Sequence, residues 1–371
     1  MLKLFEMFSG FGGASFSLKK AGINFECVGI SEIDKNAIQC FNTNFPNIKN
    51  YGDCTKINPY FLPDFDLLTG GFPCQPFSVA GNKLGELDTR GTLFYEIIRI
   101  AEVKKPTYMV LENVKGLTAP IYKNTFDRIL SELKRIGYDV LWKILDTKDY
   151  GIPQHRERIF FICKLGKWNL YEFQFPKEEK LSIGIKDLLE KCVDKKYYLS
   201  YVGKKNIKEH LIKKEREFIT TKVKSLEDII SQKSVLHTEK KNNEYLSSLN
   251  IKPEELIFLQ HRVNEIREFY KVCPTLTSIG KKPIIIQPYG GFNDFTLNIE
   301  DVVRSLRKLT PKEFFRLMGF LNDEIKLDGL SDAQRYKLAG NGWDINLVSK
   351  LFREMFGNDK TKSFVRSLKD F

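Results

Sequence analysis

The chain has 371 residues, of which 42% are hydrophobic and 29% are charged, as in a folded globular protein. Lys and Arg outnumber Asp and Glu by 59 to 47, and the resulting net charge of +12 is compatible with a polyanionic partner but equally with a Lys-rich proteome. The composition excludes collagen and coiled coils, and no apolar run is long enough to span a membrane. Seven scattered cysteines without a Cys-x-x-Cys pair exclude a disulfide framework and a zinc ribbon, so we expect a cytoplasmic protein.

The alternation of predicted strands and helices ends at about residue 165. In residues 1–165, short apolar runs alternate with amphipathic stretches. Strands are expected at Leu2–Phe8, Glu26–Ser31, Asp66–Thr69, Tyr108–Leu111, Val140–Leu145 and Ile159–Cys163, and helices at Ala14–Lys20, Asn36–Asn44, Leu93–Glu102 and Thr125–Gly137. This alternation predicts an α/β domain over 1–165, with a Rossmann-like, mostly parallel sheet covered on both faces. Such sheets bind ligands beyond the carboxyl ends of their strands.

The middle of the chain, 166–304, has a different character. It is rich in Lys and Glu and lacks a strand–helix rhythm, although short strands with Gly and Pro turns are expected over Pro274–Phe295. We interpret it as a second, smaller domain with a recognition role. Residues 305–371 return to helices, which are expected at Pro311–Met318 with Thr310 as the N-cap, after Ser331-Asp332, and at Ile345–Phe356.

A glycine-rich turn, Phe8-Ser9-Gly10-Phe11-Gly12-Gly13, joins the first expected strand to the first helix. Glycines let the backbone approach a ligand closely, although the spacing differs from the dinucleotide fingerprint and a simple tight turn fits equally well. Glu32 follows at the spacing where an acid binds a ribose, and Asp53 is placed to meet an adenine amino group. The set suggests a nucleoside-bearing cofactor, whereas either acid alone would fit a helix cap or a loop charge.

Two further strand ends carry reactive side chains. Cys74 stands in the stiff loop Gly70-Gly71-Phe72-Pro73-Cys74-Gln75-Pro76, where a thiol can act as a nucleophile, although most lone cysteines are small buried hydrophobes. Glu112 ends the strand that begins at Tyr108 and should project near Cys74. A carboxyl group that is desolvated in a cleft has a raised pKa and can donate a proton near neutral pH.

The segment Gln154-His155-Arg156-Glu157-Arg158 precedes the strand expected at Ile159. In an extended chain Arg156 and Arg158 lie on one face together with Gln154. Two guanidinium groups on one face suit a phosphate or carbonyl oxygen, and the alternative is a surface salt-bridge ladder with Glu157. The four histidines show no metal-ligand spacing, so no metal is expected.

Taken together and in order, these elements and Gly340-Asn341 strongly resemble the DNA cytosine-5 methyltransferases of bacterial or phage type. The resemblance covers 1–165 and 305–371, with a variable insert between them, which is that family's own layout. It implies a catalytic domain over 1–165, a target-recognition domain over 166–304, and closing helices over 305–371 that return to the catalytic domain. The segment from Arg307 to Glu313 resembles the element that braces the recognition domain.

The resemblance implies methyl transfer from S-adenosylmethionine to C5 of a flipped-out cytosine in duplex DNA, with S-adenosylhomocysteine as the product. Cys74 would attack C6 of the base, Glu112 would hydrogen-bond N3 and the exocyclic amine, and Arg158 would contact O2 with Arg156 beside it. The implied cofactor-binding residues are Phe8, Gly10, Gly12, Glu32, Ile33, Asp53, Cys54, Pro73, Leu93 and Asn341.

The same resemblance implies that the loop from Cys74 to Arg90 closes over the DNA. The implied DNA-contacting residues are Gln75, Ser78, Lys83, Arg90, Gln154, Thr275 and Leu276. A monomer that is associated with the nucleoid when it acts is expected, and a cognate restriction endonuclease is a candidate partner.

The chain departs from the family pattern at two places in the cofactor region. Ile33 stands where many members have tryptophan, and Gly342-Trp343-Asp344 follows Asn341 where a small residue and valines are usual. Two alternative functions stay open: methylation of tRNA by the same chemistry, and DNA binding without catalysis. The retention of both Cys74 and Glu112 speaks against the second alternative.

Overall fold

The computed structural model describes residues 1–72, 93–169, 172–199, 257–262, 265–270, 284–286 and 306–357. The chain divides into two compact units, which we treat separately. The first comprises Met1–Ile152, Arg156–Ser182 and Phe315–Phe371, and the second comprises Pro153–His155 and Ile183–Phe314. The domain boundaries at 165 and 304 stay predictions.

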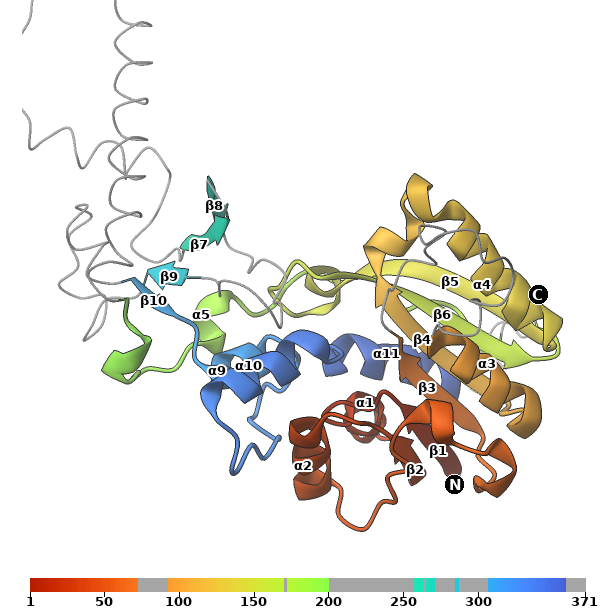
Figure 1. The fold of residues 1–371 in the computed structure, drawn as a ribbon. Coiled ribbons are helices and arrows are strands. Elements are labelled where there is room, and N and C mark those ends of the chain that lie inside the picture. The colour runs from red at the N-terminus through yellow and green to blue at the C-terminus, as the bar shows by residue number, and fades with distance from the viewer. Residues whose placement is uncertain are drawn as a thin grey trace, which may run out of the picture. The chain divides into compact units, whose positions relative to one another are not determined.

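A six-stranded sheet forms the centre of the first unit (Figure 1). Its order is β2-β1-β3-β4-β6-β5, in which β6 runs antiparallel to both neighbours and the other pairs are parallel. The strands are β1 (Leu2–Met7), β2 (Phe25–Ser31), β3 (Leu67–Gly71), β4 (Tyr108–Val114), β5 (Tyr138–Asp146) and β6 (Glu157–Leu165). The predicted α/β fold with a mostly parallel sheet is confirmed.

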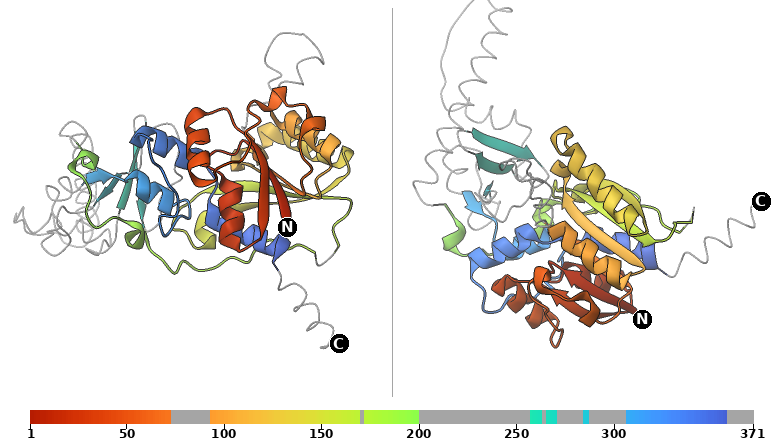
Figure 2. Two further views of the ribbon diagram at one scale, coloured as in Figure 1. Left: turned by 90° about the horizontal axis from the view of Figure 1, so that it is seen from below. Right: turned by 45° about the vertical axis from the view of Figure 1, so that its right-hand side comes forward.

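Helices cover both faces of this sheet because successive strand residues alternate between two cores. In β1, Leu4 belongs to the core shared with α1, α2 and α11, whereas Phe5 belongs to the core shared with α3 and α4. The two groups of helices lie on opposite faces of the sheet (Figure 2). These helices are α1 (Gly13–Ala21), α2 (Lys35–Asn44), α3 (Leu93–Lys104), α4 (Lys123–Arg135) and α11 (Ile345–Phe356). None of the helices in the described ranges is long and apolar enough to cross a membrane.

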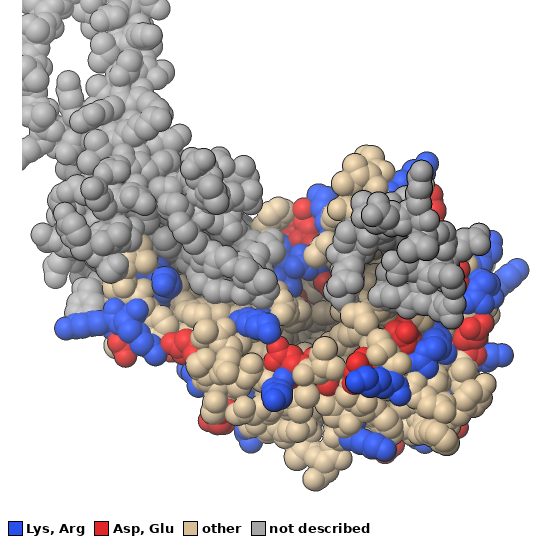
Figure 3. Space-filling view, in the orientation of Figure 1, with Lys and Arg blue, Asp and Glu red and all other residues tan. Residues whose placement is uncertain are grey.

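Shorter elements complete the first unit. The 3-10 turns are η1 (Cys54–Lys56), η2 (Pro59–Phe61), η4 (Lys115–Thr118), η5 (Pro120–Tyr122) and η6 (Thr147–Tyr150). Helix α10 (Asp332–Asn341) begins with a capping box in which Ser331 and Gln334 bond each other's backbone N–H groups. On the face shown in Figure 3, Lys and Arg side chains of the described residues are interspersed with Asp and Glu.

The second unit contains a small antiparallel sheet of order β10-β9-β7-β8. Its strands are β7 (Ile257–Arg262), β8 (Glu265–Tyr270), β9 (Ile284–Ile286) and β10 (Leu306–Lys308), and the short helical elements α5 (Ile185–Leu188) and η7 (Lys195–Tyr197) precede them. The helix α9 (Pro311–Arg316) follows β10. The fully buried Arg307 and Glu313 form a two-pronged ion pair with N–O distances of 2.6 and 2.8 Å, and Glu313 also accepts from the Thr310 N–H. The segment that resembles a brace is thus held by charge-assisted hydrogen bonds.

Candidate active site

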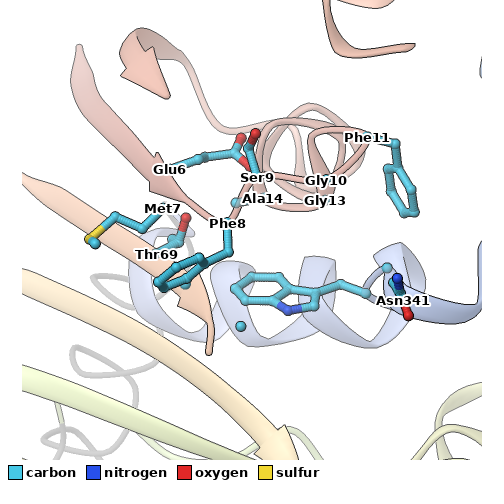
Figure 4. Close-up of a pocket in the computed structure, with 14 residues that line it drawn as sticks. Glu6, Met7, Phe8, Ser9, Gly10, Phe11, Gly13, Ala14, Thr69 and Asn341 are labelled. Carbon is cyan, nitrogen blue, oxygen red and sulfur yellow. The ribbon is translucent and has the colours of Figure 1, made fainter. Parts of the chain in front are cut away.

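Two cavities open where β1, β3 and β4 end. The smaller, of about 40 Å³, is lined by the glycine-rich turn and the residues after α10 (Figure 4). The larger, of about 380 Å³, reaches from Phe8 and Glu32 to Glu112 and is within the size range of ligand sites. Phe8, Gly10, Gly71, Asn341 and Gly342 line both cavities, so the two share a wall. The site lies at the strand ends where the sheet topology predicted it.

The backbone of the glycine-rich turn is left-handed at three positions. Phe8, Gly10 and Gly12 have φ values of 53°, 55° and 95°, a region that glycine adopts readily and phenylalanine rarely. Phe8 is held there because its N–H donates to the Ser31 carbonyl of β2 at 2.8 Å. A Cβ on Gly12 would lie 3.0 Å from the rings of Phe41 and Phe45, so glycine is also needed there for space. The turn therefore presents its backbone to the cavity.

Glu32 connects this turn to the end of β2. One carboxylate oxygen accepts the Gly10 N–H at 2.9 Å, and the other accepts the N–H groups of Ile33 and Asp34 at 2.8 and 2.9 Å. The Asn50 side chain also accepts a hydrogen bond from the Glu32 N–H and donates one to the Glu32 carbonyl. These bonds fix the carboxylate at the cavity wall as a hydrogen-bond acceptor.

Glu6 is a buried carboxyl group behind the same turn. It lies on β1 and accepts hydrogen bonds from the Ser15 N–H, at 2.7 Å, and from the Ser15 hydroxyl group. Because the N-cap Gly12 has no side chain, Glu6 supplies the acceptor that the first turn of α1 needs. Burial raises the pKa of Glu6 to about 7, and the hydrogen bonds from Ser15 oppose that rise.

Glu112 and Arg158 form an ion pair at the opposite end of the larger cavity. Arg158 Nε lies 2.9 Å from Glu112 Oε1, and the two side chains are only 16% and 14% exposed. Burial raises the pKa of Glu112, and the neighbouring Arg158 and Arg156 partly oppose that rise. The carboxyl group can therefore hold a proton at a higher pH than an exposed glutamate.

The strand register brings the start of the Cys74 loop to Glu112. Gly71, the last residue of β3, pairs with Glu112, and the Asn113 side chain donates to the Phe72 carbonyl at 3.1 Å. Cys74 itself lies outside the described residues, two positions after Phe72. Phe72 therefore lies beside the residue that follows Glu112. Only two residues of chain, which span at most about 7 Å, separate Phe72 from Cys74.

Arg156 joins the sheet to the segment between α10 and α11. It is buried, and its guanidinium group donates to the carbonyl oxygens of Gly340 and Gly342 at 3.2 and 2.8 Å. Burial lowers the pKa of Arg156 to about 9, with nearby Arg158 acting in the same direction, so the group stays cationic at neutral pH. Arg156 and Arg158 both line the larger cavity, as expected for alternate residues of an extended segment.

The predicted site residues fall into three sets. Those that line the cavities are Phe8, Gly10, Glu32, Asn341, Glu112, Arg156 and Arg158. Gly12, Ile33, Asp53, Cys54 and Leu93 are described but are not among the lining residues of either cavity, and Gln154 is fully buried in the second unit. Outside the described residues lie Pro73, Cys74, Gln75, Ser78, Lys83, Arg90, Thr275 and Leu276.

Local surroundings explain why several of the predicted residues do not line the cavities. The Ile33 side chain is 72% exposed. Asp53 caps η1 by accepting from the Thr55 N–H and hydroxyl group, and these bonds lower its pKa. Cys54 is buried in the core beneath η1, where burial raises its thiol pKa to about 11. As cofactor residues these positions stay predictions.

Three residues of the site were not singled out from the sequence. They are Glu6, Ser9 and Asn113. An acid within the apolar run Leu4-Phe5-Glu6-Met7 is the signal that could have indicated Glu6. The buried Ser9 hydroxyl group lines the smaller cavity and has no hydrogen-bond partner among the described residues. Ser9 stands within the glycine-rich motif and Asn113 directly follows Glu112, but the sequence assigned no role to either side chain.

Comparison with known proteins identifies the family. Residues 2–357 match the family model of the C-5 cytosine-specific DNA methylases. The chain belongs to this family. The orphan methyltransferase M.SPRI of Bacillus phage SPR is 30% identical over 95% of this chain and 97% of its own. The type II methyltransferase M.Bsp6I of Bacillus sp. (strain RFL6) is 32% identical over 96% of this chain and 99% of its own.

Solved structures share the fold of this methylase. A DNMT2 from Spodoptera frugiperda superposes with a TM-score of 0.65 over 96% of this chain and all of its own, at 18% identity. The enzyme is thus a DNA (cytosine-5-)-methyltransferase, and its family implies S-adenosylmethionine-dependent methylation of cytosine. The resemblance drawn from the sequence motifs is confirmed.

Proposed function

We propose that this methylase transfers the methyl group to C5 of a single cytosine that is flipped out of duplex DNA, through a covalent bond between Cys74 and C6. The observation that carries the proposal is the buried Glu112–Arg158 pair, which stands beside the start of the Cys74 loop and lines the same cavity as Phe8 and Glu32. In this arrangement, Glu112 can give a proton to the cytosine ring as negative charge develops on it. The methyl donor would lie at the end of the cavity that Phe8 and Glu32 line.

The residues around the glycine-rich turn fit S-adenosylmethionine. The carboxylate of Glu32 is fixed as an acceptor and suits ribose hydroxyl groups, and the Phe8 ring borders both cavities. The unpartnered Ser9 hydroxyl group suits a polar group of the amino acid moiety. When bound, S-adenosylmethionine supplies an electrophilic methyl group and leaves as S-adenosylhomocysteine. No metal takes part in this scheme.

Cys74 performs the step that makes C5 reactive. Its thiolate sulfur forms a bond to C6 of cytosine, the 5,6 double bond shifts, and N3 takes the proton from Glu112. The resulting enamine is nucleophilic at C5, whereas unmodified cytosine is not. After methylation, C5 gives its proton to water and the Cys74 sulfur leaves C6. The N3 proton then returns to Glu112.

Glu112 and the two arginines orient the ring. Glu112 bonds N3 and the exocyclic amine, and its raised pKa favours the protonated form that this role requires. Arg158 Nε lies beside Glu112 Oε1 and its Nη1 donates to the Glu157 carbonyl, so the Nη2 N–H groups are the ones that contact O2. Arg156 maintains the wall by holding the Gly340 and Gly342 carbonyls.

Recognition of the target sequence belongs to residues 166–304, including Thr275 and Leu276. We expect Lys83 and Arg90 to contact phosphates, and Gln75, Ser78 and Gln154 to contribute to DNA binding. One chain carries every residue of the scheme, and we expect the enzyme to act as a monomer.

Transfer of labelled methyl groups tests the proposal. The purified enzyme is incubated with S-adenosylmethionine and either duplex DNA or bulk tRNA, and bisulfite sequencing locates the modified cytosines. We expect methylation of DNA at one recurring sequence, and Cys74→Ala should abolish it while Cys192→Ala, at an exposed cysteine, retains it. Equal transfer to tRNA would support the tRNA alternative, and DNA binding without any transfer would support the non-catalytic alternative.

A further inference from the structure

Trp343 stands at one of the two places in the cofactor region where the sequence departs from the family pattern. It lies between α10 and α11, is 9% exposed and lines the smaller cavity. Its ring contacts Phe160 of β6 edge-on, with centroids 6.3 Å apart. Phe160 is the register partner of Glu112, so the indole packs directly beside the strand position that carries the carboxyl group.

The sheet geometry explains why the two side chains meet. Glu112 and Val110 point to the same face of β4, and Val110 belongs to the core covered by α11. Trp343 comes two residues before α11 begins and belongs to the same core. Burial raises the pKa of Glu112, and the nearby Trp343 indole N–H acts as a donor that opposes this rise.

Gly71 leaves the space for this contact. A Cβ on Gly71 would lie 2.9 Å from Trp343 Nε1 and 3.1 Å from Glu112 Oε2, so both polar atoms border the same point above β3. Arg158 Nε of β6 lies 2.9 Å from Oε1, and the indole Nε1 from the segment before α11 borders the same space as Oε2.

We propose that Trp343 is a positioning residue that holds the Glu112 carboxyl group in its productive orientation through the indole N–H, a role that rests on the proposed function of Glu112. Packing alone would require only an apolar ring. The N–H adds a donor that favours the ionised carboxylate and so keeps the Glu112 pKa below the value that burial alone would give. It couples the α10–α11 segment, which contains Asn341, to the proton donor.

Trp343→Phe is the sharpest variant because it removes the N–H and keeps an aromatic ring. We expect the single-turnover rate of methyl transfer to fall by about 10-fold, as the loss of one hydrogen bond to a charged group predicts. Because the N–H favours the ionised form, its loss raises the Glu112 pKa and moves the alkaline limb of the pH–rate profile to higher pH. Trp168→Phe is the matched control, since the Trp168 indole N–H has no hydrogen-bond partner among the described residues, and it should leave the profile unchanged.

A double-mutant cycle separates positioning from packing. If Trp343 acts through Glu112, Trp343→Phe should have little further effect in a Glu112→Gln background. An equal fall in rate at every pH, together with the full effect in the Glu112→Gln background, would show that Trp343 only packs and would overturn the proposal. An unchanged rate and profile would overturn it as well.

Fluorescence tests the contact without any catalysis. The chain has three tryptophans, so Trp142→Phe combined with Trp168→Phe leaves Trp343 as the only emitter. We expect its emission to titrate with pH and the transition to disappear when Glu112→Gln is added. A titration that persists in Glu112→Gln, or no titration at all, contradicts the contact. If the enzyme proved unable to methylate cytosine but the Glu112-dependent titration were present, the proposed function would fail while the contact stood.

Discussion

The two ends of the site are built by different means. At the glycine-rich turn, the backbone shapes the cavity: Phe8, Gly10 and Gly12 have left-handed φ values, and Glu32 binds three backbone N–H groups. At the opposite end, charged side chains shape it, because Glu112 contacts Arg158 and lies within the field of Arg156. Both ends are bordered by the same segment, Asn341 and Gly342.

This difference fits the proposed separation of cofactor binding at one end from the reaction at the other. A backbone-built surface is rigid and needs few specific side chains, which suits a cofactor that is the same in every turnover. Where charged side chains form the surface, the pKa of each ionisable group depends on its neighbours. Such a surface suits a group that must release and recover a proton. Substitutions at the first end should therefore alter affinity or stability, and those at the second end should alter rate.

The largest expected effect is that of Glu112→Gln. Glutamine keeps the shape but cannot donate an acid proton, so the single-turnover rate of methyl transfer should fall by about 10²–10⁴-fold. Binding of S-adenosylmethionine, measured by calorimetry, should change little because the turn around Phe8 is untouched. A rate within a factor of about three of the native rate would remove Glu112 from the reaction.

Glu6→Gln should change how stability depends on pH. Burial raises the pKa of Glu6 from 4.5 to about 7, so the folded state binds a proton more tightly than the unfolded state. The contribution of Glu6 to stability is present below pH 4.5 and is lost as pH rises through 7. Urea unfolding should be measured at pH 5 and pH 8. Between these pH values, the free energy of unfolding of the variant should rise relative to that of the native protein by up to about 3 kcal/mol.

The pH-dependent difference identifies the Glu6 carboxyl group. A constant difference between the native protein and Glu6→Gln at the two pH values would mean that Glu6 does not change ionisation on unfolding. Asn would be too short to reach Ser15, so Gln is the matched replacement.

A third prediction concerns the glycine that borders both ends. A Cβ on Gly342 would lie 1.9 Å from Phe11 Cε1, and Phe11 is enclosed by Phe16, Phe315 and Phe320. Gly342→Ala should therefore lower the free energy of unfolding by about 1–3 kcal/mol, measured in urea. Gly116→Ala is the control, because a Cβ there meets only Val114 Cγ2 at 3.9 Å. Equal stability of the two variants would contradict the tight packing of Phe11.

The smallest effect is expected for Glu32→Gln. The Gln side chain retains one oxygen for Gly10 or for the Ile33 and Asp34 N–H groups but not both, so the affinity for S-adenosylmethionine should fall by about 10-fold. The rate at saturating cofactor should stay near the native value. A selective fall of that rate, with unchanged affinity, would place Glu32 in the reaction rather than in binding.

Hydrophobic periodicity predicted the core elements well. The helix expected at Ile345–Phe356 has those bounds in the structure, and the helix expected after Ser331-Asp332 begins at Asp332. The strand expected to end at Leu111 continues to Val114, because Glu112 and Asn113 pair with β6 although they are polar. Polar strand ends are therefore where apolar patterns underestimate strands and where the site residues lie.

Motifs and contacts differ in how far the sequence predicts them. Glu32, Glu112 and Arg158 were found because they stand at fixed positions in ordered motifs. The roles of Glu6 and Asn113 depend on partners that only the fold brings near. These are Ser15, across the strand–helix turn, and Phe72, directly after the neighbouring strand β3. The contact of Trp343 with Glu112 joins segments more than 200 positions apart, which no local pattern reveals.

Covalent trapping tests the central claim most directly. Duplex DNA in which 5-fluorocytosine replaces the target cytosine is incubated with the enzyme and S-adenosylmethionine, since fluorine at C5 prevents the elimination that frees the sulfur. The account predicts a complex that survives denaturation, with peptide mass spectrometry locating the base on Cys74 and no complex in Cys74→Ser. A complex formed through another cysteine, or methyl transfer to cytosine with no trapped complex, would contradict it.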